Sequence, residues 1–343
     1  MKKSLLILLF TCWALFFAAF RPVMPFAAET AAFPDGTPVT GGRILMGTIG
    51  EPSNLIPYMA SDSASGEITG LLYVAPLKYD KDLNVVPWAA ASYEVLEGGR
   101  LLRFVLRDDI RWEDGVPLTA DDVEFTYKLM IDPKTPTAYS GDFLAIESFK
   151  KTGRLSFEVR YAKPFARSLM TWMGAILPKH VLEGQDIMTT PVARKPIGAG
   201  PYRLAKWDAG SMLTLTASDT YFEGRPNLDE VVYRIIPDPS TMFLELKAGK
   251  LDMMSLSPQQ YLRQTQGPQW ERDWRKYRYL SFSYTFLGFN LEHPFFKDVR
   301  VRRAISMAID RQSLIDGVLL GQGVPTVGPY KPGTWAYNDK LTP

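Results

Sequence analysis

The sequence has little cysteine and little histidine. Cys12 is the single cysteine among 343 residues, and His180 and His293 are the two histidines. One thiol excludes a disulfide framework and a zinc site built on cysteines. Neither histidine lies near a cluster of metal-binding side chains, and a histidine in that setting is usually a surface or loop residue. The sequence therefore predicts no metal site and no cofactor.

An excess of one charge is also lacking. The chain has 39 basic and 37 acidic residues, so its formal charge is only +2. A protein that binds nucleic acid needs a basic surplus to neutralise the phosphates, and no nucleic-acid partner is predicted. Hydrophobic residues make up 46% and charged residues 22%, a composition that allows large cores. At roughly 150 residues per domain, the length predicts about two domains.

The residue patterns of common catalytic sites are absent. A serine triad needs a nucleophile elbow, and the sequence contains no G-x-S-x-G motif. Residues 198–200 (Gly-Ala-Gly) start like a dinucleotide loop, but Arg203 stands where the third glycine belongs. The acidic pairs at 108–109 and 121–122 lie beside turns and a helix start, where capping and solvation explain them. The sequence predicts a protein that is not an enzyme.

The longest hydrophobic run lies at the amino terminus. A short positively charged start precedes an almost wholly apolar stretch from Ser4 to Phe20, and Ala27 and Ala28 are small residues suited to cleavage. This is the layout of a secretory signal peptide, so residues 1–28 are predicted to direct export to the periplasm. An uncleaved membrane anchor is the alternative, although the run is shorter than the ~20 residues of a typical span.

Hydrophobic periodicity in the rest of the chain predicts an α/β protein. Residues 29–42 are polar, rich in proline and glycine, and predicted to be flexible. Strands are predicted at residues 43–48, 100–107, 154–161, 201–219 (a hairpin) and 231–236. Helices are predicted at residues 66–77, from residue 119 onward, at 240–249 and at 300–316. Thr119 and Asp122 match a capping box at the start of the second helix.

Four stretches together resemble one protein family. They are Gly47–Pro57 (GTIGEPSNLIP), Leu102–Tyr127 with its DGVPLTA turn, Pro196–Tyr202 (PIGAGPY) and Phe289–Arg311 with its PFFKDVRVRRA run. In this order they resemble the extracellular solute-binding proteins of family 5, which bind dipeptides, oligopeptides or nickel for ABC importers. Ala199 stands where that family more often has threonine or asparagine. Each stretch also has a local explanation as a turn or a helix start, so we expect these motifs to mark the fold and not the ligand contacts.

The resemblance implies a two-lobed α/β clamshell of the periplasmic-binding-protein type (type II, cluster C) with mixed sheets and an incomplete second lobe. Lobe I would comprise residues 43–58 and 188–254, with an extra subdomain at 59–187. Residues 255–343 would form a partial lobe II. Because family members are considerably longer, we expect a truncated product or a fragment that binds peptides weakly and tends to aggregate.

The function that the resemblance implies is peptide binding for an ABC importer. Dipeptides or oligopeptides would lie in a cleft between the lobes and pass to the transmembrane permease subunits. The protein would be a monomer that meets the membrane only through the permease or an uncleaved signal. Nickel complexes and oligosaccharides remain alternative cargoes, because one fold hosts several ligands. A sensory binding protein and an inactive truncated remnant are alternative roles.

Positions in relatives suggest the candidate ligand contacts. These candidates are Ser61, Asp62, Ser63, Trp172, Tyr284, Thr285, Phe286 and Asn290. Each group also has a purely structural explanation. Residues 61–63 fit a solvated polar loop, residues 284–286 fit a buried strand, and Trp172 fits core packing.

Overall fold

A computed structural model of the protein describes residues 38–334 and 336–341. The described chain divides between Ser255 and Leu256 into two compact units. We call residues 38–255 the amino-terminal unit and the described residues from 256 onward the carboxyl-terminal unit. The predicted signal peptide and most of the predicted lead-in lie outside the described residues.

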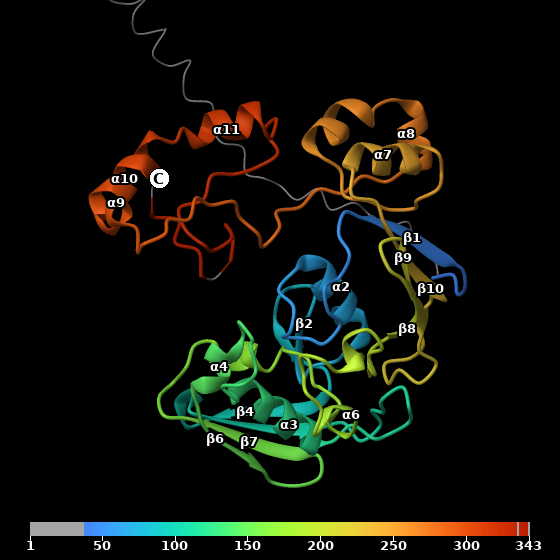
Figure 1. The fold of residues 1–343 in the computed structure, drawn as a ribbon, viewed down its shortest axis with the longest axis vertical. Coiled ribbons are helices and arrows are strands. Elements are labelled where there is room, and N and C mark those ends of the chain that lie inside the picture. The colour runs from blue at the N-terminus through green and yellow to red at the C-terminus, as the bar shows by residue number, and fades with distance from the viewer. Residues whose placement is uncertain (1–37, 335, 342–343) are drawn as a thin grey trace, which may run out of the picture. The chain divides into compact units, whose positions relative to one another are not determined.

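The amino-terminal unit contains a four-stranded mixed sheet in the order β1-β10-β9-β8. Strand β1 (Arg43–Thr48) runs parallel to β10 (Glu230–Ile235), while β9 (Met212–Ala217) is antiparallel to both β10 and β8 (Tyr202–Asp208) (Figure 1). The strands predicted at 43–48, 201–219 and 231–236 are confirmed. Val231 and Tyr233 of β10 point into the core, as expected from the two-residue period of a strand.

A second, antiparallel sheet has the order β4-β5-β7-β6. Its inner strands, β5 (Leu101–Leu106) and β7 (Ser156–Tyr161), are the two strands predicted from strict alternation, and both predictions are confirmed. The outer strands β4 (Ala90–Leu96) and β6 (Ile146–Lys151) were not predicted. Most of their side chains are exposed, and a strand with so little buried surface leaves a weak hydrophobic pattern.

Helix α3 (Ala120–Ile131) covers one face of this second sheet (Figure 1). Its start is the predicted capping box: the backbone N–H of Thr119 donates to Asp122 Oδ2 at 2.8 Å, and Thr119 Oγ1 accepts from the N–H of Asp121. These bonds satisfy backbone donors that have no partner within the helix. Val123 and Met130 then reach the core from the buried side of the helix.

Shorter elements complete the amino-terminal unit. They are α2 (Ser63–Leu72), β2 (Leu77–Tyr79), β3 (Val85–Pro87), α4 (Ser140–Leu144), α5 (Ser168–Thr171), α6 (Lys179–Leu182), α7 (Pro239–Lys247) and 3-10 turns at Glu97–Gly99 and Pro191–Ala193. The predicted helix at 240–249 corresponds to α7. The helix predicted at 66–77 is wrong at both ends, because α2 begins three residues earlier at Ser63, after its cap Asp62, and the backbone becomes extended at Tyr73.

A close backbone approach joins the end of α2 to the loop before β8. The N–H of Gly200 donates to the carbonyl of Leu72 at 2.8 Å. A Cβ at Gly198 would lie 2.0 Å from the same carbonyl oxygen, so only glycine fits there. The Pro196–Tyr202 motif is therefore a packing contact. Buried residues from Leu55 to Tyr233 form one cluster that includes side chains from α2 and both sheets.

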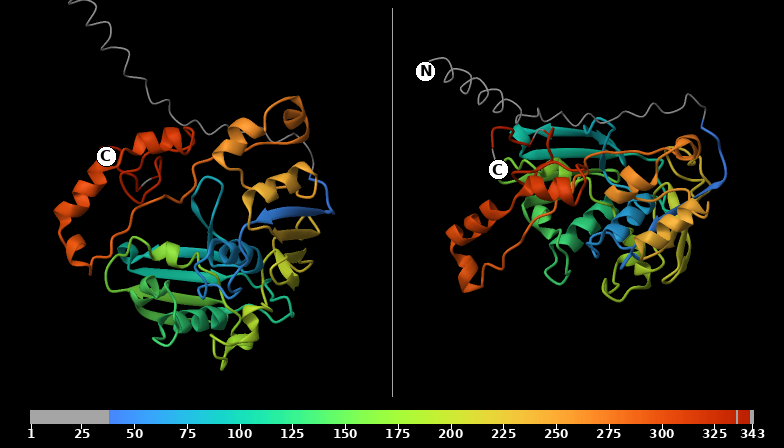
Figure 2. Two further views of the ribbon diagram at one scale, coloured as in Figure 1. Left: turned by 45° about the horizontal axis from the view of Figure 1, so that its top comes forward. Right: turned by 90° about the horizontal axis from the view of Figure 1, so that it is seen from above.

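The carboxyl-terminal unit is helical in its described residues. It contains a π-helical turn (Gln260–Gln264), α8 (Pro268–Asp273), α9 (Pro294–Lys297), α10 (Val299–Ala308) and α11 (Arg311–Gly317). Figure 2 shows these helices in orange to red, with a long stretch of coil between α8 and α9. The single helix predicted at 300–316 is wrong. Helix α10 ends before Ile309. Asp310 then caps the start of α11, and its carboxylate accepts from the N–H of Ser313 at 2.9 Å.

Candidate functional site

The turn that follows β1 is held in place by Glu51. One carboxylate oxygen accepts from Trp207 Nε1 at 2.6 Å, and the other accepts from the N–H of Gly210 at 3.1 Å. The Arg194 guanidinium lies 3.9 Å from the centre of the Trp207 ring, where a cation is attracted to the π face. These contacts join the turn to the β8–β9 hairpin. Glu51 belongs to a family motif, but its partners are too far along the chain to be inferred from the sequence.

Residues 61–63 come directly after this turn, and all three are exposed. Asp62 is the N-cap of α2: its Oδ1 accepts from the N–H of Ser65 at 2.8 Å, and its Oδ2 accepts from the hydroxyls of Ser65 and Ser53. Burial works to raise the pKa of Asp62, but the bonds from Ser53 and Ser65 outweigh it and hold the pKa below its usual value. The carboxylate is thus ionised at neutral pH and occupied within its own loop. Ser61 and Ser63 make no side-chain hydrogen bond with other described residues.

The loop is also anchored at Tyr58, which the sequence analysis did not select. Its φ of 74° lies in the left-handed region that a tyrosine rarely adopts. The Tyr58 hydroxyl donates to the carbonyl of Ala175 at 2.8 Å, and its own carbonyl accepts from Thr137 Oγ1 at 2.8 Å. A Cβ at Gly174 would lie 2.2 Å from that hydroxyl. These contacts hold the strained backbone three residues before the loop, and no local sequence pattern indicates them.

Trp172 is placed in the core of the amino-terminal unit and not at its surface. Its side chain is 3% exposed and lies among the rings of Phe104, Phe143, Phe149 and Phe157, with centroid distances of 5.3–6.2 Å. A ring in this position has no free face for a ligand that approaches from solvent. The surroundings of Trp172 are therefore those of a side chain packed in the core, which is the structural explanation given for it in the sequence analysis.

Tyr284, Thr285 and Phe286 lie in the carboxyl-terminal unit. They belong to an extended, exposed stretch before α9, and Phe286 is 72% exposed. The alternative interpretation of this stretch as a buried strand is therefore wrong. The rings of Tyr284 and Phe286 lie 5.5 Å apart, as two side chains on one face of an extended chain do. Asn290 Oδ1 accepts from the N–H of Glu292 at 3.0 Å and forms the turn that leads into α9.

Both histidines have structural partners. His180 Nε2 lies 2.8 Å from Asp114 Oδ2 in a half-buried pair, and His293 Nδ1 accepts from the N–H of Phe295 at the start of α9. In the part of the chain that the structure describes, no three side chains of His, Cys, Asp or Glu gather where they could hold a metal ion. The same part contains no helix with the length and hydrophobicity to cross a bilayer.

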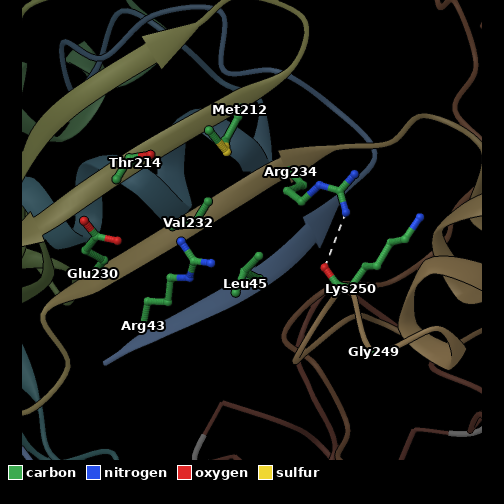
Figure 3. A pocket seen from close by; sticks show the side chains of 9 residues that line it. All are labelled: Arg43, Leu45, Met212, Thr214, Glu230, Val232, Arg234, Gly249 and Lys250. Atoms are coloured by element: carbon green, nitrogen blue, oxygen red, sulfur yellow. Dashed lines mark hydrogen bonds between the residues drawn. The ribbon is translucent and has the colours of Figure 1, made fainter. Parts of the chain in front are cut away.

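An open pocket of about 570 Å³ lies on the face of the first sheet that points away from the core (Figure 3). Its lining residues are Arg43, Leu45, Met212, Thr214, Glu230, Val232, Arg234, Gly249 and Lys250. Arg234 donates to Glu245 at 2.7 Å and to the carbonyl of Lys250 at 3.3 Å. The hydrogen bond from Arg234 lowers the pKa of Glu245, so this pair is ionised at neutral pH. None of the residues selected from the sequence lines this pocket.

Comparison with known proteins places these features in a family. The sequence profile of the bacterial extracellular solute-binding proteins, family 5 Middle, matches residues 84–343. The chain is 32% identical over 308 residues to the oligopeptide-binding protein AppA of Bacillus subtilis, with 88% of this chain and 56% of that protein covered. It is 31% identical over 310 residues to protein XP55 of Streptomyces lividans, with 88% and 55% covered. The chain thus spans about half the length of the curated relatives it matches.

Solved structures agree with this placement. The structure of AppA from Bacillus subtilis in complex with a nonapeptide superposes with a TM-score of 0.81 at 31% identity, over 89% of this chain and 61% of that one. The structure of NikZ from Campylobacter jejuni in complex with Ni(L-His) superposes with a TM-score of 0.73 at 26% identity. This match covers 81% of this chain and 55% of that one. The α/β fold class predicted from the sequence is confirmed.

Proposed function

The chain belongs to the bacterial extracellular solute-binding proteins of family 5, and we propose that it binds peptides as the substrate-binding component of an ABC importer. The observation that carries this proposal is the likeness to AppA, whose solved structure holds a nonapeptide. The proposal includes export to the periplasm, delivery to the transmembrane permease subunits and enclosure of the ligand between two lobes. It involves no covalent step.

We propose that the amino-terminal unit contributes the loop 61–63. Ser61 and Ser63 offer exposed hydroxyls that donate and accept, which suits the N–H and C=O groups of a peptide backbone. The Asp62 carboxylate has its oxygens occupied by Ser53 and Ser65. Its part is to hold the loop in one conformation, because an ordered loop loses less entropy when it binds.

The carboxyl-terminal unit would contribute residues 284–286 and Asn290. The rings of Tyr284 and Phe286 offer exposed apolar area to ligand side chains, and Thr285 offers a hydroxyl. Contacts with the ligand backbone do not depend on its sequence, and water fills the space around its side chains. Such a site accepts peptides of many sequences.

A nickel complex is the second candidate ligand, favoured by the likeness to NikZ, which was solved with Ni(L-His). Because the described residues contain no cluster of metal-binding side chains, nickel would have to bind as a complex with an organic chelator. A sensory role and an inactive remnant remain the alternatives to transport.

Photo-crosslinking tests the proposal even when binding is weak. The chain is irradiated with nonapeptides that carry benzoylphenylalanine, and the crosslinked residues are mapped by mass spectrometry. We expect adducts at 61–63 and 284–290 that an unlabelled nonapeptide suppresses and that Ni(L-His) or an oligosaccharide does not. Adducts spread over the surface, or competition by Ni(L-His) alone, would overturn peptide binding. Ser61→Ala with Ser63→Ala is expected to reduce the yield, while Ser92→Ala on the exposed strand β4 serves as the matched control.

A further inference from the structure

Tyr58 has a backbone conformation that suits glycine better than tyrosine. Its φ of 74° is left-handed, a region that glycine occupies without steric cost and that strains a residue with a side chain. Leu83 and Glu97 also have positive φ, but they lie in the turns of the hairpins β2–β3 and β4–β5, where such angles are common. Tyr58 lies between β1 and α2, in no hairpin. Strain of this kind persists only where the surroundings fix it, and it gathers at functional sites.

The side chain of Tyr58 makes contacts that a glycine could not make. Its hydroxyl donates to the carbonyl of Ala175 at 2.8 Å. Burial of this end of the side chain raises the pKa of Tyr58, so the hydroxyl keeps its proton at physiological pH. The ring packs edge-on against Tyr139 and Phe143, with centroids 6.0 Å apart in both pairs. These contacts join the loop to the segment around the start of α4 and to the segment after α5.

The backbone of Tyr58 is held from the same two segments. Its carbonyl accepts from Thr137 Oγ1 at 2.8 Å, and Thr137 Oγ1 accepts from the N–H of Tyr139 at 3.2 Å. The Tyr58 hydroxyl passes so close to Gly174 that a Cβ there would lie 2.2 Å from it. Both the main chain and the side chain of this one residue are therefore fixed by residues far along the sequence.

The loop that leads to residues 61–63 is fixed at three points. Before it, Leu55 and Ile56 are fully buried. After it, Asp62 caps α2. Tyr58 lies between these two ends and is the point at which the loop is tied to the part of the unit that contains α4 and α5. The direction in which the loop leaves the core is therefore set at Tyr58.

We propose that Tyr58 is a positioning residue for peptide binding, an inference that rests on the proposed role of residues 61–63. It acts without touching the ligand: the strained backbone and the anchored hydroxyl fix the loop so that the hydroxyls of Ser61 and Ser63 are held in place before the peptide arrives. A loop that is already ordered loses less entropy on binding. Thr137 and Gly174 belong to the same support, because one bonds the Tyr58 carbonyl and the other leaves room for its hydroxyl.

A spin label measures the loop without any peptide. In the chain with Cys12→Ser, Ser61→Cys gives one thiol for labelling, and Ser92→Cys on β4 is the control site. Tyr58→Phe removes the hydroxyl alone, and Gly174→Ala displaces it while the tyrosine stays. The loss of an ordinary hydrogen bond changes a population roughly 2- to 12-fold, and we expect the mobile fraction of the label in the loop to rise by that factor in both variants. The label on β4 should not respond.

Photo-crosslinking with the benzoylphenylalanine nonapeptide connects the loop to the ligand. The ratio of adducts at 61–63 to adducts at 284–290 should fall in Tyr58→Phe by the same factor of roughly 2 to 12. Tyr79→Phe, at a partly exposed ring on β2, is the matched control and should leave the ratio unchanged. Val231→Ala removes core packing in β10. It should lower the urea midpoint and leave the ratio unchanged, which separates positioning from a general loss of stability.

The possible outcomes distinguish this inference from the proposed function. Unchanged mobility of the loop label in either Tyr58→Phe or Gly174→Ala would overturn the anchoring, and Gly174→Ala decides alone if Tyr58→Phe does not fold. A more mobile label with an unchanged adduct ratio would overturn the positioning role. A native chain without adducts that an unlabelled peptide suppresses would overturn peptide binding and the ligand role of Tyr58 with it, while the label reports separately on the loop.

Discussion

The two units differ in how far they cover their apolar side chains. In the amino-terminal unit, side chains such as Phe104, Trp112 and Phe157 have no exposed surface and belong to one continuous core. In the described carboxyl-terminal unit, Ile315 is the one hydrophobic side chain that is buried. Both units contain leucine, phenylalanine and tyrosine in amphipathic patterns. The difference shows that an amphipathic pattern marks an apolar face, but that this face is buried only where a second layer of helices or strands packs against it.

The largest expected effect on stability comes from removing a buried aromatic ring in the amino-terminal unit, compared with removing an exposed ring in the carboxyl-terminal unit. Phe157 is fully buried and stacks on Phe104 with ring centroids 4.8 Å apart. Phe157→Ala should lower the free energy of unfolding of the amino-terminal unit by about 3–5 kcal/mol. Phe286→Ala, at a ring that is mostly exposed, should change it by less than about 0.5 kcal/mol. Urea unfolding followed by tryptophan fluorescence measures both, and similar effects would erase the contrast between the units.

A glycine substitution tests the contact between α2 and the loop before β8. Gly198→Ala puts a Cβ against the Leu72 carbonyl, and we expect a loss of about 2–3 kcal/mol in unfolding free energy. Gly66→Ala is the control, since a Cβ there meets open space within helix α2. Alanine at such a position should stabilise the helix by about 0.5–1 kcal/mol. A Gly198→Ala protein of unchanged stability would contradict the close approach.

Two helix caps compare the units directly. Asp62 caps α2, and Asp298 caps α10 by accepting from the N–H of Arg300 at 2.8 Å. Asp62→Ala should destabilise the amino-terminal unit by about 1 kcal/mol. Asp298→Ala should leave the unfolding transition of that unit unchanged. Thermal unfolding of both variants measures the difference, and a shift caused by Asp298→Ala would show that the units unfold together.

The smallest expected effect is the pH dependence at Asp62. Although burial raises its pKa, the bonds from Ser53 and Ser65 bring the folded-state pKa below the ordinary value of 3.8. The ionised form therefore stabilises the fold above pH 3.8, and this contribution is lost as pH falls through the lowered pKa. The urea midpoints of the native chain and Asp62→Asn should differ at pH 7 and converge as the pH falls below the lowered pKa of Asp62. A difference that persists at low pH would contradict the role of the charge.

Local patterns predicted much of the amino-terminal unit. Strict alternation predicted β5 and β7, and the capping box predicted the start of α3, because these signals come from neighbouring residues. The outer strands β4 and β6 were missed because their exposed side chains carry no pattern. The helix predicted at 300–316 failed because Asp310 offers a better start for a new helix than a continuation of α10.

The candidate site was less predictable for the same reason. Residues 61–63 and 284–286 were selected from the family resemblance, and the structure finds all of them exposed. The resemblance also suggested Trp172, which the structure buries among phenylalanines. Whether an aromatic side chain faces solvent or a core depends on elements far away in the chain, and its own neighbours in the sequence do not record this.

Family membership, the α/β class and most inner strands could thus be read from the order of residues, because they rest on motifs and short-range periodicity. The tertiary structure alone decided which faces are covered. Glu51 accepts a hydrogen bond from Trp207, which lies 156 residues away in the sequence. The carbonyl of Leu72 at the end of α2 contacts the backbone of Gly198 and Gly200 in the loop before β8. It also showed that the side chains of Tyr284 and Phe286 are exposed. Burial is a property of the contacts that a side chain makes in space, and these contacts exist only once distant segments have packed together.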